Sequence, residues 1–355
     1  MRRNCFSVLR LTSYVLLASC GGTGTGPSGP SRSYRMGFSP LPPRADPAIV
    51  LPALEMWTAR ADAGILHVQL PWAAMLGGSS ATAEVAKDPL AVANYYRGKG
   101  LQVVVVLDPT DGLDRAAEAP ELVAAGRSLR EPQIQQLYRA YAAAIVSLIQ
   151  PEYLGLAAET NLIRAIAPAP LYAAVVQVAN AAAAEIRAQS ASTRLLVSVQ
   201  VETAWGLLPQ AGGYQGIDPD LAAFPFMDAL GLSSYPYAAW PDPAQVPLDY
   251  YQRVRGTTGL PVLVVEGGWT SASVSTVVSS PEKQAAYIRR QAALLERAEA
   301  LFVFQLTFTD LDLAGFPPPL PANLSFFAFL GLVDDDLNPK PALAVWDSLF
   351  ALPRR

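Results

Sequence analysis

The sequence predicts a single (β/α)8 barrel, the TIM-barrel fold in which eight parallel strands alternate with helices. Eight short apolar segments occur along the chain, and helical patterns fill the intervals between them. The intervals have the lengths that strand–helix pairs of this fold occupy. A doubly wound sheet is the alternative, but no glycine-rich GxGxxG turn follows the first predicted strand. The barrel accounts for residues 34–355 without a second domain.

The predicted strands are short apolar runs, several of them rich in β-branched residues. The run from Val262 to Val265 has no polar residue and leads directly into Glu266, which is typical of a strand buried on both faces. An unpaired carboxylate there is costly, so Glu266 is either salt-bridged or functional. The predicted strands cover residues 34–39, 64–70, 101–107, 153–158, 195–201, 227–233, 262–265 and 301–306.

The predicted helices lie between these strands. Residues 131–150 place Ile134, Tyr138, Tyr141 and Ile145 on one face, the spacing of an amphipathic helix. Proline begins several of the patterns, as it often does in the first turn of a helix. The predicted helices cover residues 47–62, 89–99, 131–150, 170–190, 248–257, 281–298 and 341–349.

Composition and charge narrow the function. The chain of 355 residues is 51% hydrophobic and 16% charged, which supports a large core and argues against disorder. Its formal net charge of −4 becomes −7 once the three arginines of residues 1–19 are removed. An acidic chain without a run of Lys or Arg has no electrostatic footprint for nucleic acid.

The N-terminus predicts export and a lipid anchor. Residues 1–19 combine a basic start with an apolar stretch too short to span a membrane, as in a secretion signal. Leu17-Ala18-Ser19-Cys20 resembles the lipobox of bacterial lipoproteins, which implies acylation of Cys20; an ordinary signal peptide is the alternative. Residues 20–33 are rich in Gly, Ser and Pro and predict a flexible tether. We therefore expect a monomer anchored in the bacterial cell envelope, on its periplasmic or extracellular face.

Carboxylates and aromatic residues stand at the carboxyl ends of the predicted strands, where this fold places its chemistry. No Lys or His is among them, which argues against Schiff-base chemistry, Ser-His-Asp hydrolysis and multi-histidine metal sites. His67 lies inside the second strand and is expected to be a hydrogen-bonded core residue. The sequence predicts no cofactor and no metal. The strand-end residues are Trp72, Asp108, Glu159, Glu202, Tyr235, Glu266 and Gln305.

Glycoside hydrolysis is chemistry that two carboxylic acids perform alone. Glu159 and Glu266 come from the fourth and seventh strands, which face each other across an eight-stranded mouth. Strict alternation along the fourth strand gives Glu159 the orientation of the small residues Gly155 and Ala157, which leave room above them. The two glutamates are therefore the predicted catalytic pair of a retaining glycosidase.

Two segments carry a family resemblance. Residues 231–240 (GLSSYPYAAW) and 261–271 (PVLVVEGGWTS) resemble glycoside hydrolase clan A, and within it most nearly the family 53 endo-β-1,4-galactanases. The resemblance implies that Glu266 is the nucleophile and Glu159 the acid/base. It also implies that Tyr235 donates a hydrogen bond to the nucleophile and that the Trp269 ring is a platform on which a sugar stacks.

The chain departs from the clan pattern at two places. Ala158 stands where the clan usually has an asparagine that binds the sugar 2-hydroxyl, and Asn161 follows two residues after Glu159. Residues 107–114 lack a histidine that family 53 carries, which weakens the prediction of galactan as substrate. A catalytically inactive glycan-binding lipoprotein is therefore an alternative.

Further residues are candidates for binding the carbohydrate substrate. Sugars present apolar faces to aromatic rings, which favours exposed tryptophans near the mouth. Glu202 is a candidate third carboxylate, and a metal-dependent lyase that uses it with Asp108, Glu159 and Glu266 is a weaker alternative. The predicted binding residues are Trp72, Asp108, Asn161, Glu202, Tyr235, Trp240, Trp269 and Gln305.

Overall fold

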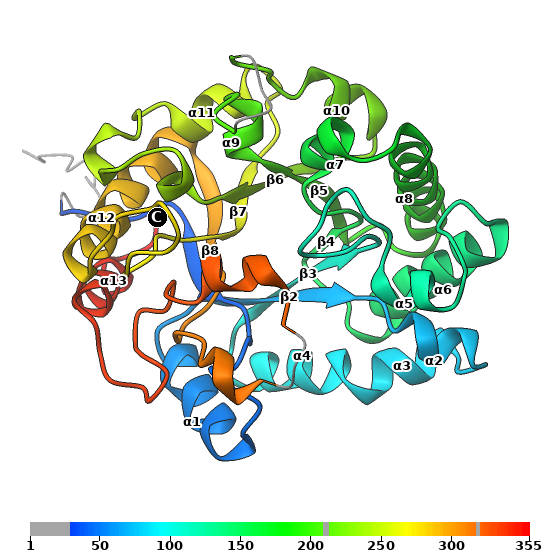
Figure 1. Cartoon of the computed structure of the whole chain (residues 1–355), viewed down its shortest axis with the longest axis horizontal. Helices are drawn as coiled ribbons and strands as arrows, with labels where there is room; N and C mark the ends of the chain where they lie inside the picture. Colours follow the sequence, from blue (N-terminus) through cyan, green and yellow to red (C-terminus); the bar gives the residue numbers. More distant parts are fainter. Residues whose placement is uncertain (1–28, 209–212, 317–319) are drawn as a thin grey trace, which may run out of the picture. The chain divides into compact units, whose positions relative to one another are not determined.

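The computed structural model confirms the (β/α)8 barrel. Eight parallel strands close in sequence order, with β1 paired to β8, and helices surround them (Figure 1). The structure describes residues 29–208, 213–316 and 320–355. The predicted signal peptide and Cys20 lie outside these residues.

The strands have the expected places but not always the expected ends. The fourth strand is shorter than predicted, and the fifth stops one residue earlier, which matters for the site. The strands are β1 (Arg35–Phe38), β2 (Ala63–Gln69), β3 (Gln102–Asp108), β4 (Tyr153–Gly155), β5 (Arg194–Gln200), β6 (Ala229–Ser234), β7 (Val262–Gly267) and β8 (Ala300–Gln305).

Every predicted helix is present, and short helices that the sequence analysis did not predict follow several strands. Proline in the first turn begins α1, α4, α6, α8, α12 and α13. The helices are α1 (Pro47–Thr58), α2 (Trp72–Leu76), α3 (Ala81–Lys87), α4 (Pro89–Gly98), α5 (Pro120–Ala124), α6 (Pro132–Leu148), α7 (Thr160–Ile166), α8 (Ala169–Gln189), α9 (Val201–Ala204), α10 (Asp218–Ala223), α11 (Tyr250–Arg255), α12 (Pro281–Ala298) and α13 (Pro341–Phe350). Short 3-10 turns are η1 (Pro236–Ala238), η2 (Pro243–Gln245), η3 (Leu313–Gly315) and η4 (Ala322–Phe327).

The core has two layers that follow from strand alternation. One set of strand residues fills the inside of the barrel, and residues of the opposite parity pack against the helices. Within the barrel, Phe302 stacks on Phe304 with ring centroids 5.8 Å apart. The inner set is Ala63, Ile65, Val104, Val106, Tyr153, Ala158, Leu196, Ala229, Leu263, Val265, Phe302 and Phe304.

The folded body begins slightly before the predicted boundary at residue 34. Arg32 is buried, and its guanidinium donates to Asp62 at 2.6 Å and to the Tyr34 carbonyl. Residues 20–33 are therefore not all tether, because this ion pair attaches the last of them to the barrel.

Helix α8 is the one helix among the described residues whose length and hydropathy suffice to cross a membrane. It packs against α6 and buries the face that includes Val175, Val178 and Ile186. Its apolar character is thus that of a barrel helix packed against its neighbours.

Candidate active site

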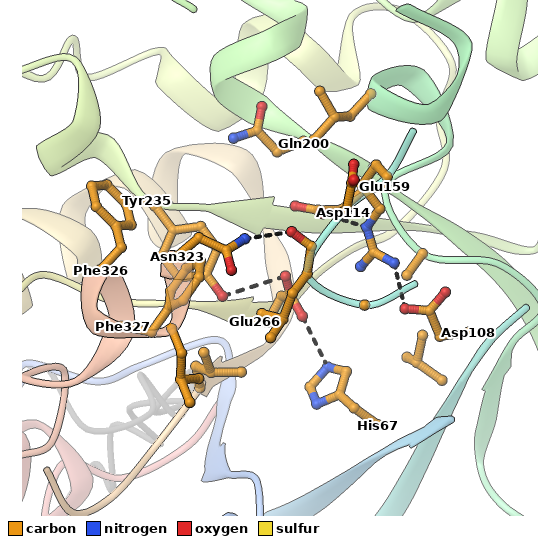
Figure 2. A pocket seen from close by; sticks show the side chains of 18 of the residues that line it. His67, Asp108, Asp114, Glu159, Gln200, Tyr235, Glu266, Asn323, Phe326 and Phe327 are labelled. Carbon is orange, nitrogen blue, oxygen red and sulfur yellow. Dashed lines mark hydrogen bonds and ion pairs between the residues drawn. The ribbon is translucent and has the colours of Figure 1, made fainter. Parts of the chain in front are cut away.

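The structure brings the two predicted catalytic carboxylates together. Ser233 Oγ lies 2.6 Å from Glu159 Oε1 and 2.8 Å from Glu266 Oε1, so these oxygens are at most 5.4 Å apart. Both glutamates line the same cavity at the barrel mouth (Figure 2). This spacing suits a nucleophile and an acid/base of a retaining glycosidase, whose carboxyl groups are about 5–5.5 Å apart.

A bulge in β7 aims Glu266 into the mouth. Leu263 and Val265 belong to the inner core, so strict alternation would turn the next residue outward. The pairing register with β6 instead shifts by one residue, and Glu266 lies opposite Ser233. Gly267 permits this path, because a Cβ there would lie 2.3 Å from the Ser234 carbonyl oxygen.

Glu159 reaches the mouth by a different route from the one that alternation predicted. Strand β4 ends at Gly155, and Ala157 packs in the outer core while Ala158 faces inward. Glu159 then adopts a left-handed backbone (φ 48°), and its N–H donates to Ser198 Oγ at 2.9 Å. Alternation from Ala157 was therefore the wrong reason for the orientation of Glu159, because strand β4 ends before the glutamate.

Arg115 joins two carboxylates and was missed by the sequence analysis. Its Nε donates to Glu159 Oε2 at 2.8 Å, and its Nη1 donates to Asp108 Oδ2. Asp108 also accepts from the Thr110 N–H at 3.1 Å. Burial disfavours the guanidinium charge, but Asp108 and Glu159 outweigh this and raise the pKa of Arg115. The site thus contains a permanent positive charge among its acids.

The protonation of the pair follows from its surroundings. Burial raises the pKa of Glu159, and Glu266 adds to the increase, although Arg115 opposes it. Burial likewise raises the pKa of Glu266, against the effects of Arg115 and Ser233. The Ser233 hydroxyl has one proton and can donate to only one carboxylate at a time. Both short contacts are therefore satisfied together when one glutamate is protonated and donates to Ser233.

His67 is not the hydrogen-bonded core residue that was expected. It faces the inside of the barrel, lines the cavity and places Nε2 3.5 Å from Glu266 Oε2. Neither ring nitrogen has a hydrogen-bond partner within the described residues. Burial lowers the pKa of His67 to about 4, so the ring is neutral near pH 7.

Tyr235 lies beside Glu266, as the clan resemblance implied. Its hydroxyl donates to Glu266 Oε1 across 3.4 Å, a long hydrogen bond. Phe327 packs edge-on against the ring at 5.0 Å and Tyr237 at 6.2 Å, which fixes its orientation. Ser233 and Tyr235 thus direct two hydroxyl groups toward one oxygen of Glu266.

The cavity over the pair has a volume of about 570 Å³, within the usual range of small-molecule sites. Polar side chains at its floor come from strand ends and from the loop after β3, while leucines, Ile166 and two phenylalanines form much of its walls. Of the predicted binding residues, Asp108 and Tyr235 line it. Lining residues that were not predicted include His67, Gln69, Arg115, Gln200, Asn323, Phe326 and Phe327.

The three predicted tryptophans do not line this cavity. Trp72 and Trp269 are each 1% exposed, and the Trp269 indole N–H donates to Ser279 Oγ at 3.0 Å. Trp269 packs against Tyr237 and Tyr287 in the outer core. Trp240 is partly buried against the same core. Their prediction as sugar platforms was wrong for this cavity, because Trp72 and Trp269 are buried and Trp240 packs against the outer core.

The polar predictions Asn161, Glu202 and Gln305 are also outside this cavity. The Asn161 amide donates to the Gln200 carbonyl at 2.9 Å and accepts from its N–H at 2.7 Å. Gln305 donates to Gln291 at 2.6 Å. All three side chains are buried and hydrogen-bonded to other groups of the protein, so they are not available to a sugar in this cavity.

Glu202 belongs to α9 rather than to the barrel mouth. Strand β5 ends at Gln200, and the helix turns the next acid away from the cavity. Glu202 accepts from the Tyr235 N–H at 3.0 Å, from the Tyr250 hydroxyl at 3.0 Å and from Ser234 Oγ at 3.2 Å. Burial nevertheless raises the pKa of Glu202 to about 7. Its contacts make it a support for the backbone of Tyr235.

Metal binding has little support in the described part of the chain. No group of three or more His, Cys, Asp or Glu side chains there has an arrangement that could hold an ion. Glu202 does not line the cavity that Asp108, Glu159 and Glu266 share, and its carboxylate accepts from Ser234, Tyr235 and Tyr250 instead of joining them as the metal-lyase alternative requires. The acids at the mouth instead share Arg115 and Ser233.

Comparison with known proteins identifies the fold. No protein-family model matches the sequence, and no significant match was found among curated proteins. An exo-β-1,4-mannosidase from Opitutaceae bacterium strain TAV5 superposes with a TM-score of 0.65 at 18% identity, over 90% of this chain and 59% of that chain. A GH5_18 protein from Streptomyces cattleya in complex with GlcNAc gives a TM-score of 0.62 at 16% identity, over 92% and 83%.

A β-glucuronidase from Ruminococcus gnavus gives a TM-score of 0.58 at 14% identity, over 90% of this chain and 50% of that chain. At these identities the likeness establishes the barrel alone. It agrees with the fold that clan A implies, whereas the closer resemblance to family 53 stays a prediction.

Proposed function

We propose that this protein is a retaining hydrolase of β-glycosides, with Glu266 as nucleophile and Glu159 as general acid/base. The main support is the Ser233 bridge, which keeps the two carboxylates within 5.4 Å of each other beside the cavity at the barrel mouth. The fold shared with glycoside hydrolases agrees with this proposal. Galactan, as family 53 suggests, and mannosides, as the mannosidase suggests, are the first substrates to test.

The surroundings of the pair assign the two roles. Ser233 and Tyr235 direct hydroxyl donors to Glu266, which favours its ionised, nucleophilic form. A protonated Glu159 donates to Ser233 in the resting site and transfers its proton to the leaving oxygen once substrate is bound. Glu266 then attacks the anomeric carbon and forms a glycosyl-enzyme. Water, deprotonated by Glu159, releases the sugar with its configuration retained.

Two observations favour the second candidate, a glycan-binding protein without catalysis. Arg115 contacts Glu159 directly and stabilises its ionised form, which opposes its action as an acid. Ala158 supplies no amide in place of the usual asparagine, and Asn161 is occupied by Gln200. In this alternative the cavity binds a carbohydrate and releases it unchanged.

Nucleophile rescue tests the proposal. A panel of aryl β-glycosides is first assayed with the wild-type protein. Glu159→Ala should then lose activity on poor leaving groups and recover it with azide on activated ones, giving the β-glycosyl azide. Glu299→Gln, a change at an exposed glutamate on the outside of the barrel, is the matched control. Carbohydrate binding without turnover in the wild-type protein would favour the second candidate.

We also propose that Cys20 carries a lipid anchor and that the protein is a monomer in the bacterial cell envelope. The lipobox-like sequence before Cys20 supports this proposal. Detergent-phase partitioning of the wild-type protein, lost in Cys20→Ser, tests the anchor. Recovery of both proteins in the aqueous phase would contradict it.

A further inference from the structure

Helix α7 forms the wall of the cavity next to Glu159. The helix begins at the residue after Glu159, so its first two turns border the carboxyl group that would protonate the leaving oxygen. Leu162 and Ile166 are four residues apart on one face of α7, and both line the cavity. Ile166 is 38% exposed, a large fraction for an apolar side chain beside a site.

The polar side chains of α7 are engaged elsewhere. Thr160 donates to Asp220 at 3.1 Å, and Arg164 donates to the same carboxylate at 2.9 Å. Asn161 is held by the backbone of Gln200. None of the three lines the cavity. The helix therefore offers no side-chain hydrogen bond to a group seated against it.

Further apolar side chains line the same cavity. Leu113 lies in the loop after β3, and Leu324 and Phe326 lie on η4; all three line the cavity. The Asn323 amide donates to the Leu113 carbonyl and links the two loops. Phe326 stacks on Tyr237 with ring centroids 4.7 Å apart, so the ring is held in place.

A sugar hydroxyl packed against Leu162 and Ile166 would lose hydration without gaining a side-chain hydrogen bond from α7. Each buried hydroxyl left without a partner costs about 1–3 kcal/mol, whereas a buried methylene is favourable. We propose that the α7 side of the cavity binds an apolar aglycone, an alkyl or aryl group, rather than a second sugar. This inference rests on the proposed function for its assignment of the leaving-group side.

Alkyl β-glycosides test the proposal. Methyl, butyl and octyl glycosides of one sugar are compared, below micelle-forming concentrations, with a disaccharide that has the same sugar at its non-reducing end. We expect kcat/KM to rise at least about tenfold from methyl to octyl, since each buried methylene contributes up to about fourfold. Equal values for methyl and octyl, or faster cleavage of the disaccharide than of the octyl glycoside, would overturn it.

Ile166→Asn localises the effect, and Val123→Asn is the matched control because Val123 is 61% exposed on α5, outside the cavity. Ile166→Asn should lower the octyl-to-methyl ratio of kcat/KM about fivefold. The control should leave that ratio unchanged. Equal ratios in both variants would place the apolar site elsewhere and overturn the proposal.

Failure of the proposed function is distinguishable from failure of this inference. If no glycoside is hydrolysed, the hydrolase proposal fails, and calorimetry with the same methyl and octyl glycosides tests the apolar site directly. Octyl binding at least about tenfold tighter than methyl binding supports the inference. Equal affinities overturn it.

Discussion

Glu266 and Glu202 both follow buried strands, yet the structure gives them opposite environments. The bulge in β7 keeps Glu266 on the inner face, beside Ser233 and over the cavity. Strand β5 ends in α9, which buries Glu202 completely among protein donors. A carboxylate after a strand is therefore insufficient to define a site. The local backbone at the strand end decides which way it points.

The largest expected effect separates these two glutamates. Glu266→Gln should lower kcat on an aryl β-glycoside by at least about 10³-fold, because it removes the nucleophile. Glu202→Gln should lower it by less than about tenfold, since Glu202 does not line the cavity. Steady-state kinetics of both folded variants gives the comparison. Equal losses would mean that Glu202 takes part in the reaction.

The second-largest effect is expected from replacing Arg115. The acids at the mouth contact this buried cation, whereas Glu202 contacts only neutral donors. Arg115→Met leaves Glu159 and Asp108 without their buried partner and should cost about 3–5 kcal/mol of unfolding free energy. It should also raise the pKa of Glu159 further, which shifts the pH profile of activity upward. Urea unfolding and a pH series of kcat measure the two effects. The exposed Arg130→Met is the control.

The pH dependence of the unfolding free energy should reveal the raised pKa of Glu202. Its folded pKa of about 7 lies above its ordinary value of 4.5, so the folded state binds the proton more tightly between these pH values. Its contribution is full below pH 4.5 and is lost as pH rises through 7, amounting to about 3 kcal/mol. Glu202→Gln should lose less stability than the wild type between pH 4.5 and 8 in thermal melts. Parallel curves for the two proteins would contradict the raised pKa.

The smallest expected effect concerns the long hydrogen bond to Glu266. Tyr235→Phe removes the hydroxyl and keeps the packing against Phe327 and Tyr237, so kcat should fall by about tenfold or less. The matched change Tyr214→Phe, at an exposed ring away from the cavity, should leave kcat unchanged. A loss as large as that of Glu266→Gln would show that Tyr235 does more than orient the nucleophile.

Sequence patterns predicted the elements of the fold well, because apolar periodicity reports directly which residues face a core. The helix predicted at residues 281–298 has those bounds in the structure. Short helices such as α7 and α9 were missed, since they span only one or two turns and follow strand ends. Those missed helices determine where Glu159 and Glu202 point.

Within the site, Glu159, Glu266, Asp108 and Tyr235 were found from the strand ends, and all four line the cavity. Arg115 lies on the loop after β3 and Phe326 on the short turn η4, where no period marks an inward direction. The acidic strand end Asp108, followed within one loop by Arg115, was the available signal for the ion pair. The tryptophans misled the prediction because their apolar rings fit a helix-facing core as well as a sugar.

The sequence by itself determined the closed barrel and the strands that carry the acids, because both follow from local apolar patterns repeated along the chain. The tertiary structure alone decided which acids meet. The β7 bulge, the break after Gly155 and the Ser233 bridge depend on how neighbouring strands pair. Such pairing joins residues far apart in the chain, and the one-residue shift between β6 and β7 departs from the alternation that either strand shows by itself.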